Sequence, residues 1–277
     1  MAAQTPAPPT PTPTAARIAL WIPARRASTR LPEKLLRKVG GRPLIAHTVQ
    51  AGCVAAAELG ASVRVVTDCA QLAEAAAQAG ALITFVREPC ASGTDRLAAA
   101  WHALDEAERP DLVLNLQGDE PLVPPDALVS LARFALAADA PMATAMIPGA
   151  AAPGEVSVVV DGRDRALYFS RAALPGRHPS ADANDLRPAW GRHVGLYVYG
   201  AELLRRWPQL TPGTLERVEG LEQLRALEHG IDIAVMRLAA ARRPWFAIDT
   251  EADLQRLVAL VAPNHPKRPD EGAGEGS

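Results

Sequence analysis

Residues 17–36 read RIALWIPARRASTRLPEKLL. The opening run, residues 18–22, is short, apolar and rich in strand-forming side chains, and it leads directly into a loop of arginine, serine and threonine. Open α/β sheets bind ligands in loops that follow the carboxyl ends of their strands. The stretch therefore predicts a first sheet strand that carries a cationic binding loop.

The same alternation of strand and helix continues along the chain. Short runs rich in β-formers are separated by longer Ala- and Leu-rich segments of helical period. We expect strands at residues 18–22, 62–67, 82–85 and 112–117, and helices at 45–59, 70–79, 94–106 and about 125–138. This alternation predicts an α/β fold with a mostly parallel, Rossmann-like sheet and helices on both faces.

The alternation of strands and helices stops after about residue 140. Strand-like segments at 142–147, 156–161, 166–170 and 193–199 follow one another without full helices between them, then helices are expected near 201–207 and 215–228, a strand at 232–237 and a final helix at 251–261. We expect a smaller antiparallel excursion at about 142–200 within one domain, 16–262. Residues 1–15, rich in proline and threonine, and residues 263–277 are expected to be disordered.

Bulk composition narrows the classes of function. With 277 residues, 48% of them hydrophobic and 22% charged, the chain can bury the core of one large domain. A net charge of −2 provides no global basic field, which argues against nucleic acid as the main partner. Three cysteines without a CxxC pair, no recognisable signal peptide and no apolar run of about 20 residues predict a cytoplasmic protein without membrane insertion.

The first loop offers donors for phosphate. Arg25, Arg30 and Lys34 supply cations suited to a triphosphate, and the hydroxyls of Ser28 and Thr29 add neutral donors. For any single arginine, a solvated surface position is an equal alternative. The loop is neither a Walker sequence nor a GxGxxG turn, so neither P-loop nor dinucleotide chemistry is indicated.

Two acidic positions could hold a metal ion. The segment VLNLQGDEP, residues 113–121, is an apolar strand that ends on Gln117, Gly118, Asp119 and Glu120. Mg²⁺ takes one or two protein carboxylates beside substrate phosphates, so Asp119 is a candidate ligand and Asp249, in AIDTEADLQRL, is the second. The alternatives are a turn former at Asp119 and a helix N-cap at Asp249 or the following threonine.

Seven blocks, in order over roughly residues 17–260, closely resemble the 3-deoxy-manno-octulosonate (Kdo) cytidylyltransferases, or CMP-Kdo synthetases. The blocks are IPARRASTRLPEK (22–34), SGTDRLA (92–98), NLQGDEP (115–121), ALYFSRAALP (166–175), RHVGLYVY (192–199), LEQLRALEHG (221–230) and IDTEADL (248–254).

The resemblance implies a reaction and a set of roles. The anomeric 2-hydroxyl of Kdo would attack the α-phosphorus of CTP, giving CMP-Kdo and pyrophosphate for lipopolysaccharide synthesis. It implies Mg²⁺ on Asp119 and Asp249, catalytic roles for these two and for Arg25 and Lys34, and a homodimer joined through roughly residues 150–200. The implied nucleotide-binding residues are Pro23, Ala24, Arg25, Ser28, Lys34, Ser92 and Gly93. The implied sugar-binding residues are Arg96, Gln117, Arg171, His193, Tyr197, Glu222 and Gln223.

Several of these residues have plainer interpretations. The alternative for Arg171 is a simple pairing with a surface acid, and a histidine in a strand, such as His193, is more often structural than a ligand. Tyr197 and Tyr199 share one strand face, as in ordinary sheet packing. Glu222 and Gln223 would diverge by about 100° on a helix, so at most one would point squarely into a site.

Departures from the family pattern leave other functions open. Relatives usually carry histidine at position 90 and lysine at position 157, where this chain has Cys90 and Ser157. A related acidic sugar (8-amino-Kdo, or a sialic- or legionaminic-type acid) is therefore an alternative substrate. A non-catalytic nucleotide-binding paralogue and an interaction module that uses the proline-rich N-terminus are the other two alternatives.

Overall fold

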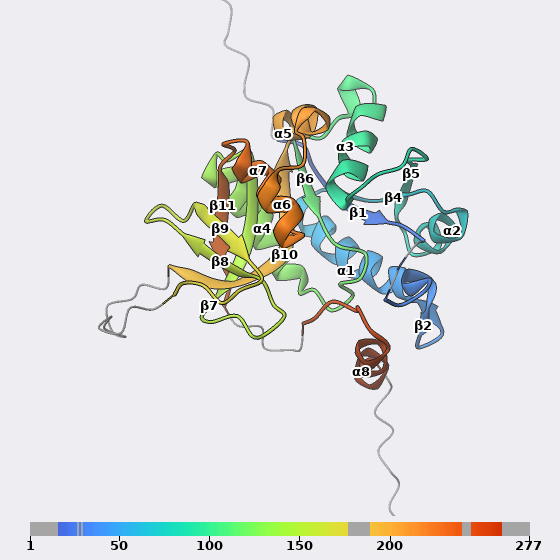
Figure 1. Ribbon diagram of the computed structural model, residues 1–277. Helices are drawn as coiled ribbons and strands as arrows, with labels where there is room; N and C mark the ends of the chain where they lie inside the picture. Colours follow the sequence, from blue (N-terminus) through green and yellow to red (C-terminus); the bar gives the residue numbers. More distant parts are fainter. Residues whose placement is uncertain (1–15, 27, 29, 177–188, 240–244, 262–277) are drawn as a thin grey trace, which may run out of the picture.

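The computed structural model describes residues 16–26, 28, 30–176, 189–239 and 245–261. The predictions made for residues 1–15, Thr29 and 263–277 lie outside the described residues. Seven strands of the central sheet form one path in the order β11-β7-β10-β6-β1-β4-β5 (Figure 1). They are β1 Ile18–Ala24, β4 Ser62–Thr67, β5 Leu82–Phe85, β6 Leu112–Asn115, β7 Met142–Pro148, β10 Trp190–Gly200 and β11 Ile233–Arg237.

Most neighbours along this path are parallel. β1 pairs in parallel with β4 and β6, β4 with β5, and β11 with β7, whereas β10 runs antiparallel to both β6 and β7. β8 (Ser157–Val160) and β9 (Ala166–Ser170) leave the path as an antiparallel extension of β10. The mostly parallel α/β fold expected from the sequence is confirmed, although β7 and β10 belong to the main sheet.

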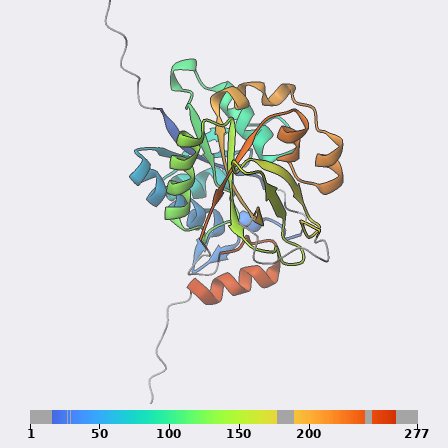
Figure 2. The same ribbon diagram turned by 90° about the vertical axis from the view of Figure 1, so that its left-hand side faces the viewer.

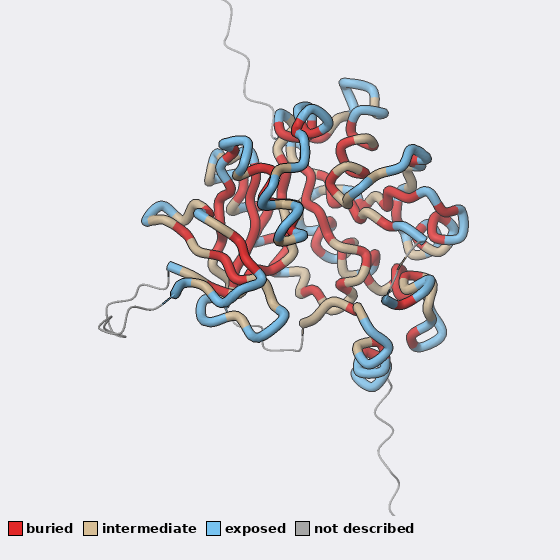
Figure 3. Tube along the Cα trace, in the orientation of Figure 1, coloured by how far each residue is buried: buried red, intermediate tan, exposed pale blue. Residues whose placement is uncertain are grey.

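Helices cover both faces because successive strand residues point to opposite sides. Leu20 and Ile22 of β1 join one buried cluster and Ala19 and Trp21 the other. The first cluster includes residues of α1 (Leu44–Leu59), α2 (Ala70–Gln78) and α4 (Pro125–Ala138). The second includes residues of α3 (Gly93–Ala103), α5 (Ala201–Arg206) and the η3 turn (Trp207–Gln209). Figure 3 shows the buried segments gathered in the central strands between exposed outer helices.

The helix predicted at 215–228 is wrong as a single element. The chain forms α6 (Thr214–Glu219) and α7 (Leu224–Glu228), because Gly220 adopts a left-handed conformation with φ 62° and ends α6. The helix predicted at 94–106 also ends earlier, at Ala103, since Leu104 is extended. Turns η1 (Lys34–Leu36) and η2 (Glu106–Glu108), and a small ribbon of β2 (Lys38–Val39) and β3 (Arg42–Pro43), were not predicted.

The last helix, α8 (Glu251–Val261), lies beyond the ends of the strands and against the β2 ribbon (Figure 2). Arg37 donates to Glu251 at 3.0 Å, which ties the beginning of α8 to η1. This attachment brings the segment before α8 to the same edge of the sheet as the first loop. Within the described residues, no helix combines the length and hydrophobicity that a membrane crossing requires.

Candidate active site

Two adjoining cavities open at the carboxyl ends of β1 and β6, where open α/β sheets bind ligands. Their volumes are about 730 Å³ and about 580 Å³. We call them the first and second cavity. Both are lined by the same six residues, which form the wall between them: Arg30, Gln117, Asp119, Gly220, Glu222 and Asp249.

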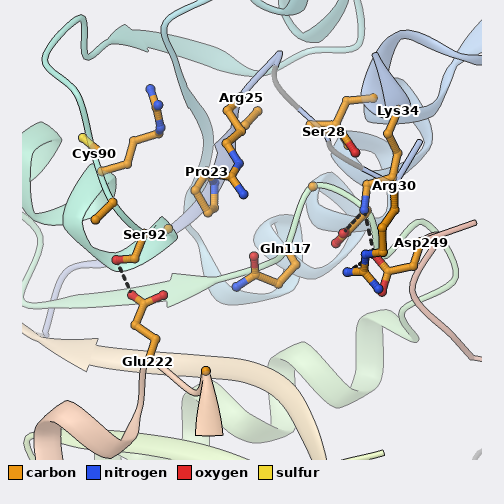
Figure 4. A pocket seen from close by; sticks show the side chains of 18 of the residues that line it. Pro23, Arg25, Ser28, Arg30, Lys34, Cys90, Ser92, Gln117, Glu222 and Asp249 are labelled. Atoms are coloured by element: carbon orange, nitrogen blue, oxygen red, sulfur yellow. Dashed lines mark hydrogen bonds and ion pairs between the residues drawn. The ribbon is translucent and has the colours of Figure 1, made fainter. Parts of the chain in front are cut away.

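The first cavity brings together every residue predicted to bind nucleotide. They come from the end of β1, the loop after it, η1 and the start of α3 (Figure 4): Pro23, Ala24, Arg25, Ser28, Lys34, Ser92 and Gly93. Ser92 is the N-cap of α3, and its hydroxyl accepts from the backbone N–H of Asp95 at 3.1 Å. The cavity therefore has cations on one side and a capped helix N-terminus on the other.

Lys34 joins the two predicted metal acids. Its Nζ donates to Asp119 Oδ2 at 2.6 Å and to Asp249 Oδ1 at 3.0 Å, and the lysine side chain is only 12% exposed. Arg30 pairs with the same Asp249 oxygen at 3.0 Å (Figure 4). The two carboxylates thus lie within reach of one cation, although 130 residues separate them in the sequence.

Local packing explains this convergence. A Cβ at Gly118 would lie 3.1 Å from Leu35 Cδ1 and 3.3 Å from the carbonyl oxygen of Pro23, so any larger residue would crowd both neighbours, whereas glycine lets the three loops approach this closely. The backbone N–H of Ile248 then donates to the carbonyl of Asp119 at 2.9 Å. The segment before α8 is thereby held directly beside the end of β6.

Thr250, and not Asp249, is the N-cap of α8. Thr250 Oγ1 accepts from the backbone N–H of Asp253 at 3.2 Å, and the Asp253 carboxylate accepts from the N–H of Thr250 at 2.8 Å. This reciprocal pair is a capping box in which an aspartate replaces the usual glutamate. Because Thr250 caps α8, the Asp249 carboxylate faces the cleft.

The acid pair fits a magnesium site that substrate would complete. Mg²⁺ usually binds through one or two carboxylates with phosphate oxygens and water as its other ligands. Asp119 and Asp249 provide two such groups. Both carboxylates contact the Lys34 ammonium, so the position between them already stabilises a positive charge. Among the described residues no group of three or more His, Cys, Asp or Glu side chains could hold a metal ion. A metal here would therefore take its remaining ligands from water and from oxygens of the substrate.

The second cavity contains six of the seven residues predicted to bind sugar: Gln117, Arg171, His193, Tyr197, Glu222 and Gln223. Arg96 is the exception. It lines the first cavity, is 5% exposed, and donates to Asp68 Oδ2 at 2.8 Å and to the Val86 carbonyl at 3.2 Å. Its position gives no support to a sugar contact.

Glu222 and Gln223 both line the cavity because they lie in the turn between α6 and α7, not on a regular helix. Glu222 Oε1 accepts from the Ser92 hydroxyl and from the Thr94 N–H, both at 2.8 Å, and burial raises the pKa of this carboxyl group. Glu222 therefore connects the start of α3 to the second cavity. Gln223 is 4% exposed, and its Nε2 has no partner among the described residues, so a ligand could accept from it.

Among the described residues, no acid forms an ion pair with the guanidinium of Arg171. Its Nε donates to the backbone carbonyl of Glu219 at 2.8 Å, and its backbone N–H donates to the Glu219 carboxylate at 2.9 Å. These bonds hold β9 against the end of α6. They also fix the guanidinium at the rim of the second cavity.

The residues of the second cavity that were not predicted as site residues include Glu120, Arg192, Tyr199 and Trp245. Trp245 Nε1 donates to Glu120 Oε2 at 2.7 Å, which fastens the segment before Asp249 to the end of β6. Burial, with a smaller contribution from the Asp119 carboxylate, raises the pKa of Glu120 to about 7. Its place next to Asp119 was a usable signal, whereas nothing local relates Trp245 to a residue 125 positions earlier.

His193 is neutral at physiological pH. Burial, followed by the positive charge of Arg192, lowers the pKa of its imidazole to about 3. The ring lies edge-on to Phe169 at 5.0 Å between centroids, and Tyr197 stacks on Tyr199 at 5.9 Å. His193 therefore offers the second cavity an uncharged hydrogen-bonding ring.

This low pKa predicts acid sensitivity of folding. The unfolded chain binds a proton near the ordinary pKa of 6.5, while folded His193 stays neutral until about pH 3. The stabilisation is thus complete above about pH 6.5 and is lost as the pH falls, by about 2 kcal/mol at pH 5. Urea unfolding of the wild type and of His193→Gln from pH 8 to pH 5 should show a shallower pH dependence in the variant. Parallel curves would contradict the buried neutral imidazole.

Comparisons with known proteins agree with this arrangement. Residues 19–233 match the family model described as Cytidylyltransferase. A 3-deoxy-manno-octulosonate cytidylyltransferase of Anaeromyxobacter dehalogenans is 44% identical over 250 residues, which cover 88% of this chain and 98% of the relative. The enzyme of the same name from Xanthomonas campestris pv. campestris is 41% identical over 256 residues, with coverages of 87% and 98%.

A solved structure has the same fold. The structure of CMP:2-keto-3-deoxy-manno-octonic acid synthetase complexed with CTP is similar with a TM-score of 0.77 and 34% identity, covering 89% of this chain and 99% of that one. On these grounds the chain belongs to the cytidylyltransferase family, as a member of its 3-deoxy-manno-octulosonate cytidylyltransferase group.

Proposed function

We propose that this chain is a nucleotidyltransferase that couples CTP to the anomeric 2-hydroxyl of Kdo, releasing CMP-Kdo and pyrophosphate. One observation carries the proposal: a cationic cavity and a polar cavity share a wall that contains the acid pair Asp119 and Asp249. Two substrates placed in these cavities would meet at that wall. The names of the relatives and the CTP complex of a similar protein identify the substrates that fit best.

The nucleotide, CTP, would bind in the first cavity. Arg25, Lys34 and Arg30 supply fixed positive charge for the triphosphate, which stabilises the charge that builds up as the α-phosphorus is attacked. The turn of Ser92 and Gly93 at the start of α3 offers backbone and hydroxyl groups to the nucleoside. Cys90 lines the same cavity, and burial raises the pKa of its thiol, so it contributes a neutral side chain.

The sugar, Kdo, would bind in the second cavity. Arg171 and Arg192 at its rim suit the sugar carboxylate, while Gln117, His193 and Gln223 suit hydroxyl groups. With a pKa of about 3, the His193 imidazole is too weak a base to remove the proton of the attacking hydroxyl. The side chains therefore act mainly by orienting the two substrates.

Asp119 and Asp249 would hold Mg²⁺ during the reaction. Bound magnesium would neutralise phosphate charge and favour ionisation of the attacking hydroxyl. Within the chain, Lys34 orients both carboxylates and Arg30 holds that of Asp249. Loading of the metal would free the Lys34 ammonium to contact phosphate oxygens.

The proposal extends to the compartment, the pathway and the oligomeric state of the enzyme. We place it in the cytoplasm, in lipopolysaccharide synthesis, and the free thiols of Cys53, Cys69 and Cys90 are compatible with a reducing compartment. We also propose a homodimer joined through roughly residues 150–200. Leu167 on β9, 62% exposed, is an apolar contact available for that purpose. The mass of the particle in solution, from light scattering, tests the dimer.

The reaction has a direct test. Purified protein with CTP, Mg²⁺ and Kdo should release pyrophosphate and form CMP-Kdo, and omission of Mg²⁺ or addition of EDTA should abolish both. Parallel reactions contain 8-amino-Kdo or a sialic acid in place of Kdo, and ATP in place of CTP. Release with another acidic sugar but not with Kdo would overturn the choice of sugar, and no release with any pair would overturn the activity.

A further inference from the structure

Strand β10 is irregular where it passes the second cavity. Val194 pairs with Ala145 of β7, but the next pair joins Tyr197 to Thr144, so residues 195–196 bulge out of the register. Bulges of this kind re-aim neighbouring side chains and leave ladder groups in need of partners. The bulge begins two residues after His193, which lines the cavity.

Thr144 fills this bulge from the neighbouring strand. It is fully buried and lines neither cavity. Its Oγ1 lies 2.7 Å from the carbonyl oxygen of Leu196, 3.3 Å from that of Val194 and 3.0 Å from His193 Nε2. One hydroxyl group thus contacts three atoms of the bulged strand.

The proton of that hydroxyl can be assigned by elimination. Carbonyl oxygens only accept, whereas a neutral imidazole nitrogen is either a donor or an acceptor. If Thr144 donated its one proton to His193, the lone pairs of the hydroxyl oxygen would face both carbonyl oxygens, at 2.7 Å and 3.3 Å, and the shortest of the three contacts would lose its hydrogen bond. The hydroxyl therefore donates to Leu196, its nearest carbonyl, and accepts from His193 Nε2–H.

This assignment fixes the chemistry of the ring. The imidazole is neutral and carries one N–H, so a proton on Nε2 leaves Nδ1 as an acceptor. Phe169 and Tyr197 pack on the ring, with centroids at 5.0 Å and 5.4 Å, and hold its orientation. Among the described residues no hydrogen bond engages Nδ1.

We propose that Thr144 is a positioning residue that fixes His193 as the Nε2–H tautomer, so that Nδ1 accepts a hydrogen bond from a sugar hydroxyl. The role of Thr144 in recognising the sugar rests on the proposed function. The assignment of the His193 tautomer does not depend on it. An acceptor at this place favours a neutral hydroxyl over the sugar carboxylate, which would face a lone pair. Thr144 thereby contributes to sugar recognition without touching the sugar.

The tautomer is measurable in the free wild-type protein. Ring ¹⁵N chemical shifts of His193, assigned by comparison with His193→Gln, should show a protonated Nε2 and an unprotonated Nδ1 at pH 7. Thr144→Ser keeps the hydroxyl and should give the same pattern. Thr144→Val, of similar shape but without the hydroxyl, should show a mixture or the opposite tautomer. A protonated Nδ1 in the wild type would overturn the proposal, whether or not either variant folds.

Steady-state kinetics test the consequence for the sugar. Loss of one oriented hydrogen bond predicts a KM for Kdo raised about tenfold in Thr144→Val, with the KM for CTP unchanged and with near wild-type values restored in Thr144→Ser. An unchanged KM for Kdo in a Thr144→Val protein whose tautomer has switched would overturn the role in recognition. If Kdo is not the substrate, no variant turns it over, and the ¹⁵N pattern still decides the tautomer.

Discussion

Replacement of Asp119 by asparagine should lower kcat/KM about 1,000-fold with the fold intact. The variant keeps the size of the side chain but removes one of the two charges that meet at the wall between the cavities. It also takes the charge from the 2.6 Å partner of Lys34, so Asp249 would be the one remaining carboxylate bonded to the ammonium. A thousandfold loss corresponds to about 4 kcal/mol of transition-state stabilisation, the scale expected for a metal ligand.

Two measurements make this prediction specific. Pyrophosphate release gives the rate, and isothermal calorimetry with Mg²⁺ and a non-hydrolysable CTP analogue should show weaker metal binding in Asp119→Asn. The matched control is Asp105→Asn, the same chemical change at an exposed position outside both cavities. Activity within threefold of wild type in the Asp119 variant would remove Asp119 from the reaction.

Replacement of Lys34 by methionine should have the second largest effect. Methionine fills similar space without the ammonium, so the variant loses a phosphate contact and leaves the carboxylates of Asp119 and Asp249 close together without their shared donor. We expect kcat/KM for CTP to fall about 100-fold, as for the loss of one charge-assisted contact to phosphate.

The same variant also tests whether Mg²⁺ binds to the acid pair that Lys34 contacts. In the wild type, Mg²⁺ must compete with the ammonium for the two carboxylates, so Mg²⁺ alone should raise the melting temperature more in Lys34→Met than in the wild type. Lys38→Met, an exposed lysine on β2, is the matched control and should respond as the wild type does. An equal or smaller magnesium response in Lys34→Met would mean that the acid pair is not the metal site.

Local sequence determined most of the elements. Strands at residues 62–67, 82–85 and 166–170 and helices at 125–138 and 251–261 were predicted with their observed ends. Period-two and helical hydrophobic patterns are properties of neighbouring residues, and they persist in the folded chain because each element buries one apolar face. The helix at 215–228 was wrong because apolar spacing alone did not reveal the left-handed turn at Gly220.

The candidate site was predictable where a motif marked it. Asp119 and Lys34 lie in distinctive segments, and the parallel sheet was enough to place both at the same edge. The sequence left Asp249 undecided between a cap and a cleft residue. That choice depended on Thr250 and Asp253 capping each other, which leaves the Asp249 carboxylate to Lys34.

The sequence by itself determined the α/β class, most of its strands and helices, and the charged residues that gather at the carboxyl edge of the sheet. Only the tertiary structure decided how these charges pair, that Arg96 faces Asp68 on the nucleotide side, and that Thr144 and Trp245 support the site from other segments. The physical reason is that hydrogen bonds between distant segments depend on strand order and on a bulge in β10. Neither leaves a periodic signal in the residues that form those bonds.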